Sequence, residues 1–370
     1  MDLSQLQINN VRNLRQVKLQ GLHRINVFFG PNGAGKTSIL EAIHLLGMAR
    51  SFRGASVKPL ISHDCPDCTV FGSITARSSS GPTSTLTLGV QRSVSGEVQI
   101  KVAGKAVRTA AQLVEHLPLQ TINADSFELL TGSPQARRQY LDWGVFHVEH
   151  RFFNQWQRFQ RCIKQRNNLL RRGKISDTEL AVWTRDLAAS GSTISEYRRA
   201  YFNELKPQFL AIMTTLAPEL TGLDLRFRRG WDKSLNYGQA LDVSHDVDKD
   251  RGYTHVGPQR ADIKVTIDGR PAAEVLSRGQ QKLVVCALKL AQGQLMSAMG
   301  RGECTYLVDD LRSELDEPHS KLICELLSTM QVQVFVTSIE REDVCAVWPE
   351  GDNLKVFHVE HGQVEPESRG

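Results

Sequence analysis

The chain has 370 residues and a mass of 41.4 kDa, which suits two or three domains better than one. Hydrophobic residues make up 41% and charged residues 23%, a composition that supports a core and excludes a largely disordered protein. No stretch reaches the roughly 18 uninterrupted apolar residues that a membrane span needs. The first residues lack the features of a secretory signal, and seven scattered cysteines suit a reducing compartment. We therefore expect a cytoplasmic protein that does not enter a membrane.

The formal net charge of +5 is unevenly distributed along the chain. Between Ser133 and Arg229 there are 17 basic and 9 acidic residues, whereas the remainder has 28 basic and 31 acidic residues. The basic excess therefore lies in the middle of the chain, where an acidic partner would be attracted.

The predicted elements start as strands and change to helices in the middle of the chain. Short strands are predicted over 3–9, 14–20 and 24–30, and roughly alternating polar and apolar residues predict further strands over 69–76, 85–91 and 98–102. A helix is predicted over 35–48, and a hairpin loop at Ser78–Pro82. Ser133-Pro134 is typical of a helix start, and long helical segments are predicted to about residue 217. Strands over 223–229, 263–267, 304–308 and 332–337 then alternate with helices over 278–299 and 318–330.

A glycine-rich loop follows the third predicted strand. Residues 30–37 match G-x-x-x-x-G-K-[ST] in full, with an apolar strand before the loop and a helix after it. Such a loop points backbone N–H groups at phosphate oxygens, and the helix N-terminus adds positive charge. We predict a nucleoside triphosphate site in which Lys36 bridges the β- and γ-phosphates and Thr37 binds Mg²⁺. The predicted nucleotide-binding residues are Gly30, Pro31, Asn32, Gly33, Ala34, Gly35, Lys36, Thr37 and Ser38.

Two adjacent carboxylates are predicted to complete this site. The apolar stretch 305–308 ends in Asp309 and Asp310, about 270 residues after the loop, a separation that excludes the compact layout of small GTPases. Asp309 is predicted to hold Mg²⁺ together with Thr37, and Asp310 to orient or deprotonate the attacking water. Lys36, Asp309 and Asp310 are thus the predicted catalytic residues.

The sequence before the helix at 278–299 resembles the Leu-Ser-Gly-Gly-Gln signature of ABC-type ATPases, with arginine in place of the first glycine. In that superfamily the signature reaches the γ-phosphate of ATP bound to the partner subunit. The resemblance therefore implies an ATP-dependent homodimer whose sites are completed by Ser277, Arg278, Gly279 and Gln280. Residues 313–316 resemble the D-loop, and Thr337 stands where transporters usually have a switch histidine.

Four further segments resemble the RecF family of bacterial DNA replication and repair ATPases. They are residues 6–14, which resemble the element that frames the P-loop, and residues 32–43, 132–142 and 254–262. The last segment resembles the family's Gly-Pro-His-Arg-Asp-Asp box, but Gln259 replaces histidine and Ala261 replaces aspartate. If the box belongs to the nucleotide interface, these departures predict weaker or differently tuned hydrolysis.

The resemblance implies both a fold and a function. The expected fold is α/β, a P-loop ABC-type ATPase head (1–130 and 221–370) with a mostly helical, basic insertion lobe (131–220). The implied function is ATP-dependent binding of single-stranded or gapped DNA in replication, recombinational repair and the SOS response. Weak, DNA-stimulated ATP hydrolysis would serve as a switch, and the implied partners are RecR and RecO, which help to load RecA.

The segment 151–174 carries eight basic residues and no acidic one, interleaved with aromatic residues. The helical spacing of Phe152, Trp156 and Phe159 places them on one face and indicates a packed core rather than stacking on bases. The basic residues fall mostly on other faces, where they bind DNA phosphates or simply face solvent. We predict DNA contacts for Arg151, Arg158, Arg161, Lys164, Arg171 and Arg172, with Arg226, Arg228 and Arg229 as further candidates.

Two other classes of protein stay open at this point. The nucleotide-binding subunit of an ABC transporter would share the P-loop and the signature, although the basic helical segment and Thr337 count against it. A chromosome-maintenance head carries a long coiled coil, for which an insertion of under about 100 residues is too short at a rise of 1.5 Å per residue. Cys65 and Cys68 form a lone C-x₂-C pair, which lacks two of the ligands of a zinc site and predicts an exposed turn.

Overall fold

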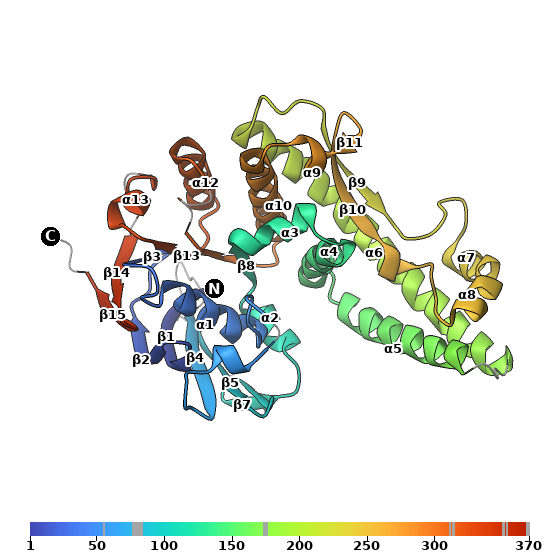
Figure 1. Ribbon diagram of the computed structural model, residues 1–370, viewed down its shortest axis with the longest axis horizontal. Helices are drawn as coiled ribbons and strands as arrows, with labels where there is room; N and C mark the ends of the chain where they lie inside the picture. Colours follow the sequence, from blue (N-terminus) through green and yellow to red (C-terminus); the bar gives the residue numbers. More distant parts are fainter. Residues whose placement is uncertain are drawn as a thin grey trace. The chain divides into compact units, whose positions relative to one another are not determined.

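The computed structural model describes residues 1–54, 56–75, 84–172, 177–310, 312, 315–349, 352 and 354–367 (Figure 1). The chain divides into two compact units: unit 1 is Met1–Ser126 with Cys286–Gly370, and unit 2 is Phe127–Val285. Residues 221–285, which the sequence analysis placed in the head, fall in unit 2 in this division. The hairpin loop predicted at Ser78–Pro82 lies outside the described residues.

Unit 1 contains an antiparallel sheet of six strands, in the order β2-β1-β4-β5-β6-β7. Its strands are formed by the alternating segments that the sequence indicates, apart from the short β7. They are β1 (Asp2–Val11), β2 (Leu14–Gln20), β4 (Asp67–Thr75), β5 (Thr85–Ser93), β6 (Val98–Val102) and β7 (Lys105–Val107).

A second six-stranded sheet of unit 1 has the order β15-β14-β3-β13-β12-β8. All neighbours are parallel except β14 and β15. The strands are β3 (Ile25–Phe29), β8 (Leu119–Ile122), β12 (Thr305–Val308), β13 (Val334–Ser338), β14 (Leu354–Glu360) and β15 (Gln363–Pro366). Because β13 lies between β3 and β12, the carboxyl ends of these three parallel strands meet at one edge of the sheet.

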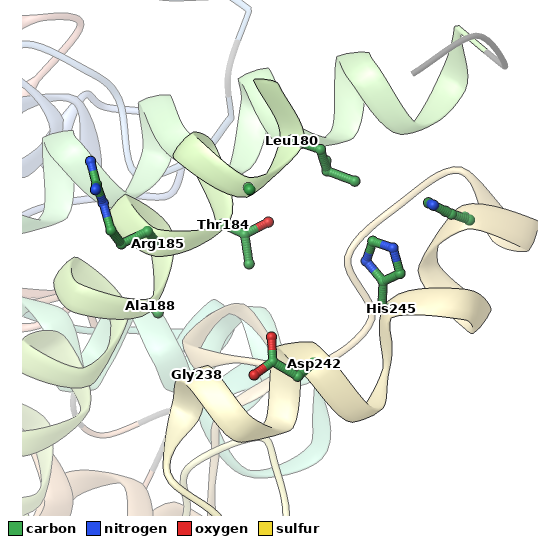
Figure 2. A pocket seen from close by; sticks show the side chains of 9 residues that line it. Leu180, Thr184, Arg185, Ala188, Gly238, Asp242 and His245 are labelled. Carbon is green, nitrogen blue, oxygen red and sulfur yellow. The ribbon is translucent and has the colours of Figure 1, made fainter. Parts of the chain in front are cut away.

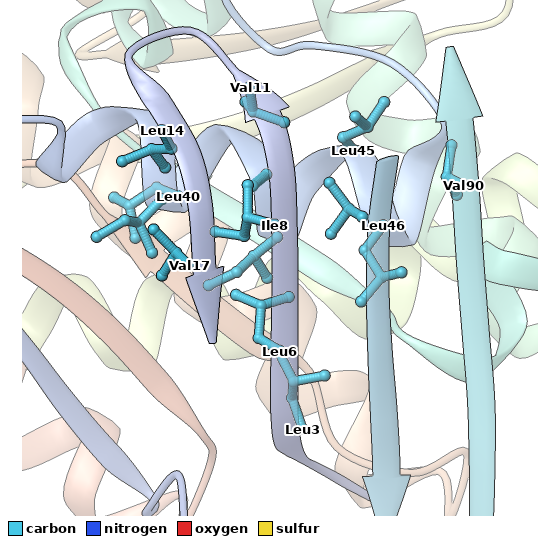
Figure 3. Packing of buried hydrophobic residues seen from close by; sticks show 14 of the residues in the cluster. Leu3, Leu6, Ile8, Val11, Leu14, Val17, Leu40, Leu45, Leu46 and Val90 are labelled. Atoms are coloured by element: carbon cyan, nitrogen blue, oxygen red, sulfur yellow. The ribbon is translucent and has the colours of Figure 1, made fainter. Parts of the chain in front are cut away.

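Helix α1 (Lys36–Met48) packs against both sheets of unit 1 and is almost wholly buried. Figure 3 shows Leu40, Leu45 and Leu46 of α1 among the leucine, isoleucine and valine side chains of β1, β2 and β5. Gly72 of β4 permits this close approach, because a Cβ there would lie 2.5 Å from Cδ2 of Leu46. Full burial of each such aliphatic side chain contributes about 1.5–3 kcal/mol, so this core fixes the first residues of α1 beneath the loop that precedes it.

The remaining helices of unit 1 are short or lie late in the chain. They are α2 (Ala111–His116), α12 (Glu317–Thr329) and α13 (Arg341–Cys345), with 3₁₀ turns η1 (Lys58–Leu60) and η2 (Ala124–Phe127, which ends at the first residue of unit 2). Helix α10 (Arg278–Ala298) begins in unit 2 and continues into unit 1.

Unit 2 is mostly helical but also holds a three-stranded antiparallel sheet, β11-β10-β9. Its helices are α3 (Glu128–Thr131), α4 (Pro134–Val148), α5 (Phe152–Arg171), α6 (Asp177–Leu216), α7 (Tyr237–Val243), α8 (His245–Arg251) and α9 (Ala272–Val275). Its strands are β9 (Leu223–Arg228), β10 (Asp262–Ile267) and β11 (Arg270–Pro271), and η3 (Pro258–Arg260) precedes β10.

Helices α5 and α6 lie side by side in unit 2 (Figure 1). On α5, Phe152 and Phe159 are buried and Trp156 is half-buried, which confirms that the aromatic residues pack in a core. Helix α6 has 40 residues and contains Pro207. At 1.5 Å per residue it is about 60 Å long, far shorter than a chromosome-maintenance coiled coil.

The C-x₂-C pair is not the exposed turn that the sequence predicts. Cys68 is the second residue of β4 and is fully buried, because the alternation of that strand turns it into the core, while Cys65 is half-buried. Among the described residues no group of three or more potential metal-ligating side chains occurs. The described helices also include none with both the length and the apolar composition needed to cross a membrane.

Candidate nucleotide site and basic surfaces

The glycine-rich loop between β3 and α1 is held in place by Asn13, in the turn between β1 and β2. The Nδ2 of Asn13 donates to the carbonyl oxygens of Gly33 and Ala34 (3.3 and 3.0 Å), and its Oδ1 accepts from the hydroxyl of Ser38 (3.0 Å). Gly35 has a φ of 122°, and a Cβ there would lie 3.0 Å from Nδ2 of Asn13, so glycine is required. The predicted framing segment does contact the loop, through Asn13, a residue that no sequence motif marks for this role. Ser38 supports the loop with its side chain, so only its backbone N–H is left to contact a phosphate.

The same turn is fastened to α1 by a buried ion pair that sequence reasoning missed. Nε and Nη2 of Arg12 donate to the two carboxylate oxygens of Glu41, each at 2.8 Å, and Glu41 is fully buried. The hydrogen bond that Arg12 donates to Glu41 raises the pKa of Arg12. Ser51 also donates to Glu41. Such a two-pronged pair fixes orientation as well as distance, so the turn and α1 hold the loop as one rigid piece.

Lys36, the first residue of α1, lies over its own loop. Its Nζ donates to the carbonyl oxygens of Gly30 (2.7 Å) and Pro31 (3.0 Å), and the residue is 8% exposed. Burial lowers the pKa of Lys36, while the nearby carboxylates of Asp310 and Asp309 oppose this effect. The ammonium group therefore lies at the loop and near the acidic pair, where a residue that binds the phosphates is expected.

The acidic pair after β12 is joined to the loop and to β13 by hydrogen bonds. Oδ1 of Asp309 accepts from the hydroxyls of Thr37 (3.0 Å) and Thr337 (2.7 Å). The Oγ1 of Thr337 in turn accepts from the backbone N–H of Asp310 (2.9 Å). Asp310 has a left-handed φ of 54°, which turns the chain sharply after the strand. The structure thus brings together Lys36, Thr37, Asp309 and Asp310 as predicted, and adds Thr337 as the link between the two aspartates.

The signature segment forms a capping box at the start of α10. The backbone N–H of Gln280 donates to Oγ of Ser277 (3.3 Å), and Oε1 of Gln280 accepts from the N–H of Ser277 (3.0 Å). Ser277, Arg278 and Gly279 are exposed, and a Cβ added at Gly279 would meet no atom within 4 Å. In the predicted D-loop, Ser313 and Glu314 lie outside the described residues, while Asp316 caps α12 by accepting from the N–H of His319 (3.1 Å).

Comparisons with known proteins agree with this geometry. A family model described as RecF/RecN/SMC N terminal domain matches residues 2–365. The DNA replication and repair protein RecF of Stutzerimonas stutzeri (strain A1501) is 50% identical over 364 residues, which cover 98% of this chain and 97% of that protein. The protein of the same name from Azotobacter vinelandii (strain DJ / ATCC BAA-1303) is 49% identical over 98% of each chain. The chain belongs to the RecF family.

Solved structures extend this family assignment to the whole fold. A structure of the recombination mediator protein RecF with ATP, from the RecFOR pathway, has a TM-score of 0.85 at 25% identity and covers 99% of this chain and 97% of that one. An Smc head bound to the C-winged helix domain of ScpA matches at a TM-score of 0.58 and 14% identity, covering 100% of this chain and 98% of that one, a likeness of fold alone. The expected fold, a P-loop head of the SMC and RecF type with a helical lobe, is confirmed, and the transporter alternative is not favoured.

The box at 254–262 has structural contacts of its own. Nε2 of Gln259 donates to the carbonyl oxygens of Thr254 (3.2 Å) and Val256 (2.8 Å), which closes the turn that precedes η3. Ala261 is 1% exposed, so an aspartate there would be buried. Asp262 binds Arg137 of the predicted 132–142 segment, with Nε to Oδ1 at 2.7 Å. An effect of the two departures on hydrolysis stays a prediction.

The predicted DNA-contacting residues of α5 form an exposed basic surface. All six predicted side chains are exposed, and one of them, Arg158, also pairs with Asp186 of α6 (3.2 Å). Arg166, in the same basic run, is instead fully buried and pairs with Asp248 (2.7 Å). Arg226 pairs with Asp224 (3.1 Å), and Nη2 of Arg229 donates to the carbonyl oxygens of Asp232 and Leu235 (2.6 and 2.8 Å), so both of these candidates already have partners within the chain. The exposed members are Arg151, Arg158, Arg161, Lys164, Arg171 and Arg172.

Proposed function

We propose that this chain is an ATP-controlled DNA-binding protein of replication, recombinational repair and the SOS response. The single observation that carries the proposal is the contact between Thr37 and Asp309, residues 272 positions apart that share a hydrogen bond of 3.0 Å at the mouth of the glycine-rich loop. A hydroxyl oxygen and a carboxylate oxygen are ligands of the kind that Mg²⁺ prefers, so these two residues fit a site for ATP·Mg²⁺. The relatives named for DNA replication and repair, and the solved structure with ATP, support this reading.

In the proposed reaction the loop's backbone N–H groups and Lys36 bind the phosphates. Lys36 would exchange the carbonyl oxygens of Gly30 and Pro31 for phosphate oxygens, and Asp310 would accept a proton from the attacking water. Bound Mg²⁺, held by Thr37 and Asp309, would neutralise charge that develops on the phosphates. Only a few charged side chains act on the phosphates, so we expect slow ATP hydrolysis. DNA would stimulate this hydrolysis, which would switch the protein between its binding states.

The second half of each site is proposed to come from the signature of a partner subunit. Glycine within a helix costs about 1 kcal/mol relative to alanine, yet Gly279 meets no atom of its own chain that would exclude a side chain. This cost is explained if another molecule approaches closely at that point. The exposed N-terminus of α10, with Ser277, would then face the γ-phosphate of the ATP bound to the partner.

DNA is proposed to bind unit 2, whose basic excess the sequence shows, and single-stranded or gapped DNA is the expected form. The solved relatives belong to the RecFOR pathway. We therefore propose RecR and RecO as partners, loading of RecA as the outcome, and the cytoplasm as the location.

Sedimentation velocity tests this proposal directly. The parent chain and Lys36→Met are compared with and without ATP·Mg²⁺ and gapped DNA, at two salt concentrations. Lys101→Met, a change of the same kind at an exposed residue of β6, is the control. We expect the parent and Lys101→Met to form ATP-dependent dimers on DNA that weaken steeply with salt, whereas Lys36→Met stays monomeric.

Two outcomes would contradict the proposal. Monomers of the parent that ignore both ATP and DNA would remove the DNA function while leaving a nucleotide site. Equal dimerisation of Lys36→Met and Lys101→Met would show that assembly does not depend on the loop.

A further inference from the structure

Unit 2 contains a large basic pocket that is separate from the exposed surface of α5. Its volume is about 1100 Å³, and its lining comes from α6, from the segment around the end of β9, from the end of α8 and from residues 253–260. The lining includes one acidic side chain, Asp232, and six basic ones: Arg199, Arg228, Arg229, Lys233, Arg251 and Arg260.

The cations of this pocket converge from distant parts of the chain. Arg199 lies on α6, Arg228 ends β9, and Arg251 ends α8, and all three are exposed. A run of basic residues in one segment often only faces solvent, but a concave surface that gathers several cations raises the local potential and attracts a polyanion. Small-molecule sites span roughly 300–1,000 Å³, so this pocket has room for more than one nucleotide.

Aromatic side chains give the pocket a second binding property. Trp231 lines one side of the pocket in a fixed orientation, because its Nε1 donates to the carbonyl oxygen of Leu235 (3.2 Å) and its ring centroid lies 4.8 Å from that of Tyr237. Tyr253 is half-buried, and the guanidinium of Arg260 lies 5.9 Å from its ring centroid. A base that stacks on Tyr253 would therefore have a cation beside it for the adjoining phosphate.

A buried network fixes one side of the pocket in advance. His255 lines the pocket, and its backbone N–H donates to Oδ1 of Asp248 (3.1 Å). Oδ2 of Asp248 accepts from Nη1 of Arg166 (2.7 Å), which also donates to Oγ1 of Thr254 (2.6 Å). Arg166 and Asp248 are fully buried, so the segment that carries Tyr253 and His255 is anchored to α5 and α8. An anchored segment loses little conformational freedom when a ligand binds.

A second pocket of unit 2 has a different lining and suits a polyanion less well. It measures about 460 Å³, lies between α6 and the α7–α8 segment, and is lined by small and apolar side chains with charges of both signs (Figure 2). Asp242 lies among its lining residues with Arg185 and His245. A polyanion gains less there, because two Lys/Arg side chains and one carboxylate line that pocket, whereas six Lys/Arg side chains and one carboxylate line the basic pocket.

We propose that the basic pocket binds a single-stranded segment of DNA, with its phosphates on Arg199, Arg228 and Arg251 and one unpaired base on Tyr253. This inference rests on the proposed function and locates the strand within unit 2. A base pair offers no free face to a ring inside a pocket, whereas an unpaired strand offers both bases and phosphates.

The test measures anisotropy of a labelled oligothymidylate with the full chain and ATP·Mg²⁺ over a range of salt. The pocket variant is Arg199→Gln/Arg228→Gln/Arg251→Gln. A matched control removes three exposed cations of unit 2 outside the pocket: Arg185→Gln/Lys264→Gln/Arg270→Gln. Each lost phosphate contact reduces the steepness of the plot of log affinity against log salt by about 0.7. The slope of the pocket variant should therefore be shallower than that of the parent by about 2, and the slope of the control should be almost unchanged. Equal thermal midpoints would show that both variants are folded.

Substitution of Tyr253 separates stacking from charge. Tyr253→Leu should weaken binding about tenfold with an unchanged salt slope, whereas Tyr253→Phe should bind as the parent does. Equal binding by the leucine variant would remove the stacking step.

The failures are distinguishable. If the parent binds neither the oligothymidylate nor gapped DNA, the proposed function itself fails. If the parent and the pocket variant bind the oligothymidylate equally well, only the inference about the pocket fails. A third variant, Arg161→Gln/Lys164→Gln/Arg171→Gln, removes exposed cations of α5, and a loss of binding confined to this variant would place the strand on α5 instead. Equal competition by blunt duplex, or by thymidine monophosphate at the same phosphate concentration, would also overturn it.

Discussion

Thr337→Val removes a single hydroxyl that holds both aspartates of the nucleotide site. That hydroxyl donates to Asp309 at 2.7 Å and accepts from the backbone of Asp310 at 2.9 Å, and Thr337 is only 1% exposed. A hydrogen bond to a charged group is worth about 1.5–3 kcal/mol, and the second hydrogen bond, from a backbone N–H, is worth about 0.5–1.5 kcal/mol. We therefore expect the free energy of unfolding to fall by about 3 kcal/mol.

The same change should slow hydrolysis more than it weakens ATP binding. Thr37 still donates to Asp309, so the carboxylate keeps one of two hydroxyl partners and loses its fixed orientation. Misplacement that costs about 1.4 kcal/mol in the transition state slows the reaction about tenfold. DNA-stimulated ATPase assays and urea unfolding measure the two effects, with Thr337→Ser as the control that keeps the hydroxyl. Valine and serine variants that hydrolyse ATP at equal rates would refute this reasoning.

Three further predictions test other parts of the structure. Gly279→Ala should raise the free energy of unfolding by about 0.5–1 kcal/mol while it weakens the proposed ATP-dependent dimer. Undiminished dimerisation in sedimentation would contradict the proposed role of that glycine. His147 is buried against Trp143, and burial lowers the pKa of its imidazole to about 4. As the pH falls from about 6.5 to about 4, the imidazole takes up a proton in the unfolded chain but not in the folded one, so the free energy of unfolding decreases over that range. Thermal unfolding of His147→Phe should show a shallower decline there, and parallel curves would refute the assignment. Arg166→Met should lower the free energy of unfolding by about 3–5 kcal/mol, because it removes the arginine that pairs with the buried carboxylate of Asp248. Adding Asp248→Asn should restore part of the loss, and strictly additive losses in urea unfolding would argue against coupling.

The nucleotide site was predictable because its signals are local. A strand, a glycine-rich loop and a helix follow one another in sequence, and each sets the backbone geometry of the next. The apolar strand before Asp309 is equally local, and the parallel sheet places its end beside the loop. Thr337 was identified by position, but its link between the aspartates was not, because that link depends on β13 lying between β3 and β12. Strands β8 and β14 were missed: β8 has only four residues, and both depend on neighbours distant in the sequence.

The basic residues of unit 2 show where sequence reasoning needs the fold. In the run 151–174, eight cations look alike, yet helical period separates them: Arg166 lies four residues after Cys162 and seven after Phe159, both buried, so it belongs to the packed side of α5. A buried arginine must be paired, and its partner, Asp248, lies 82 positions later. That same aspartate holds His255 at the edge of the basic pocket. Arg166 resembles in sequence the neighbours that are predicted to contact DNA, but in the structure it anchors one side of the basic pocket. The cations of that pocket come from four separate parts of the chain and share no motif.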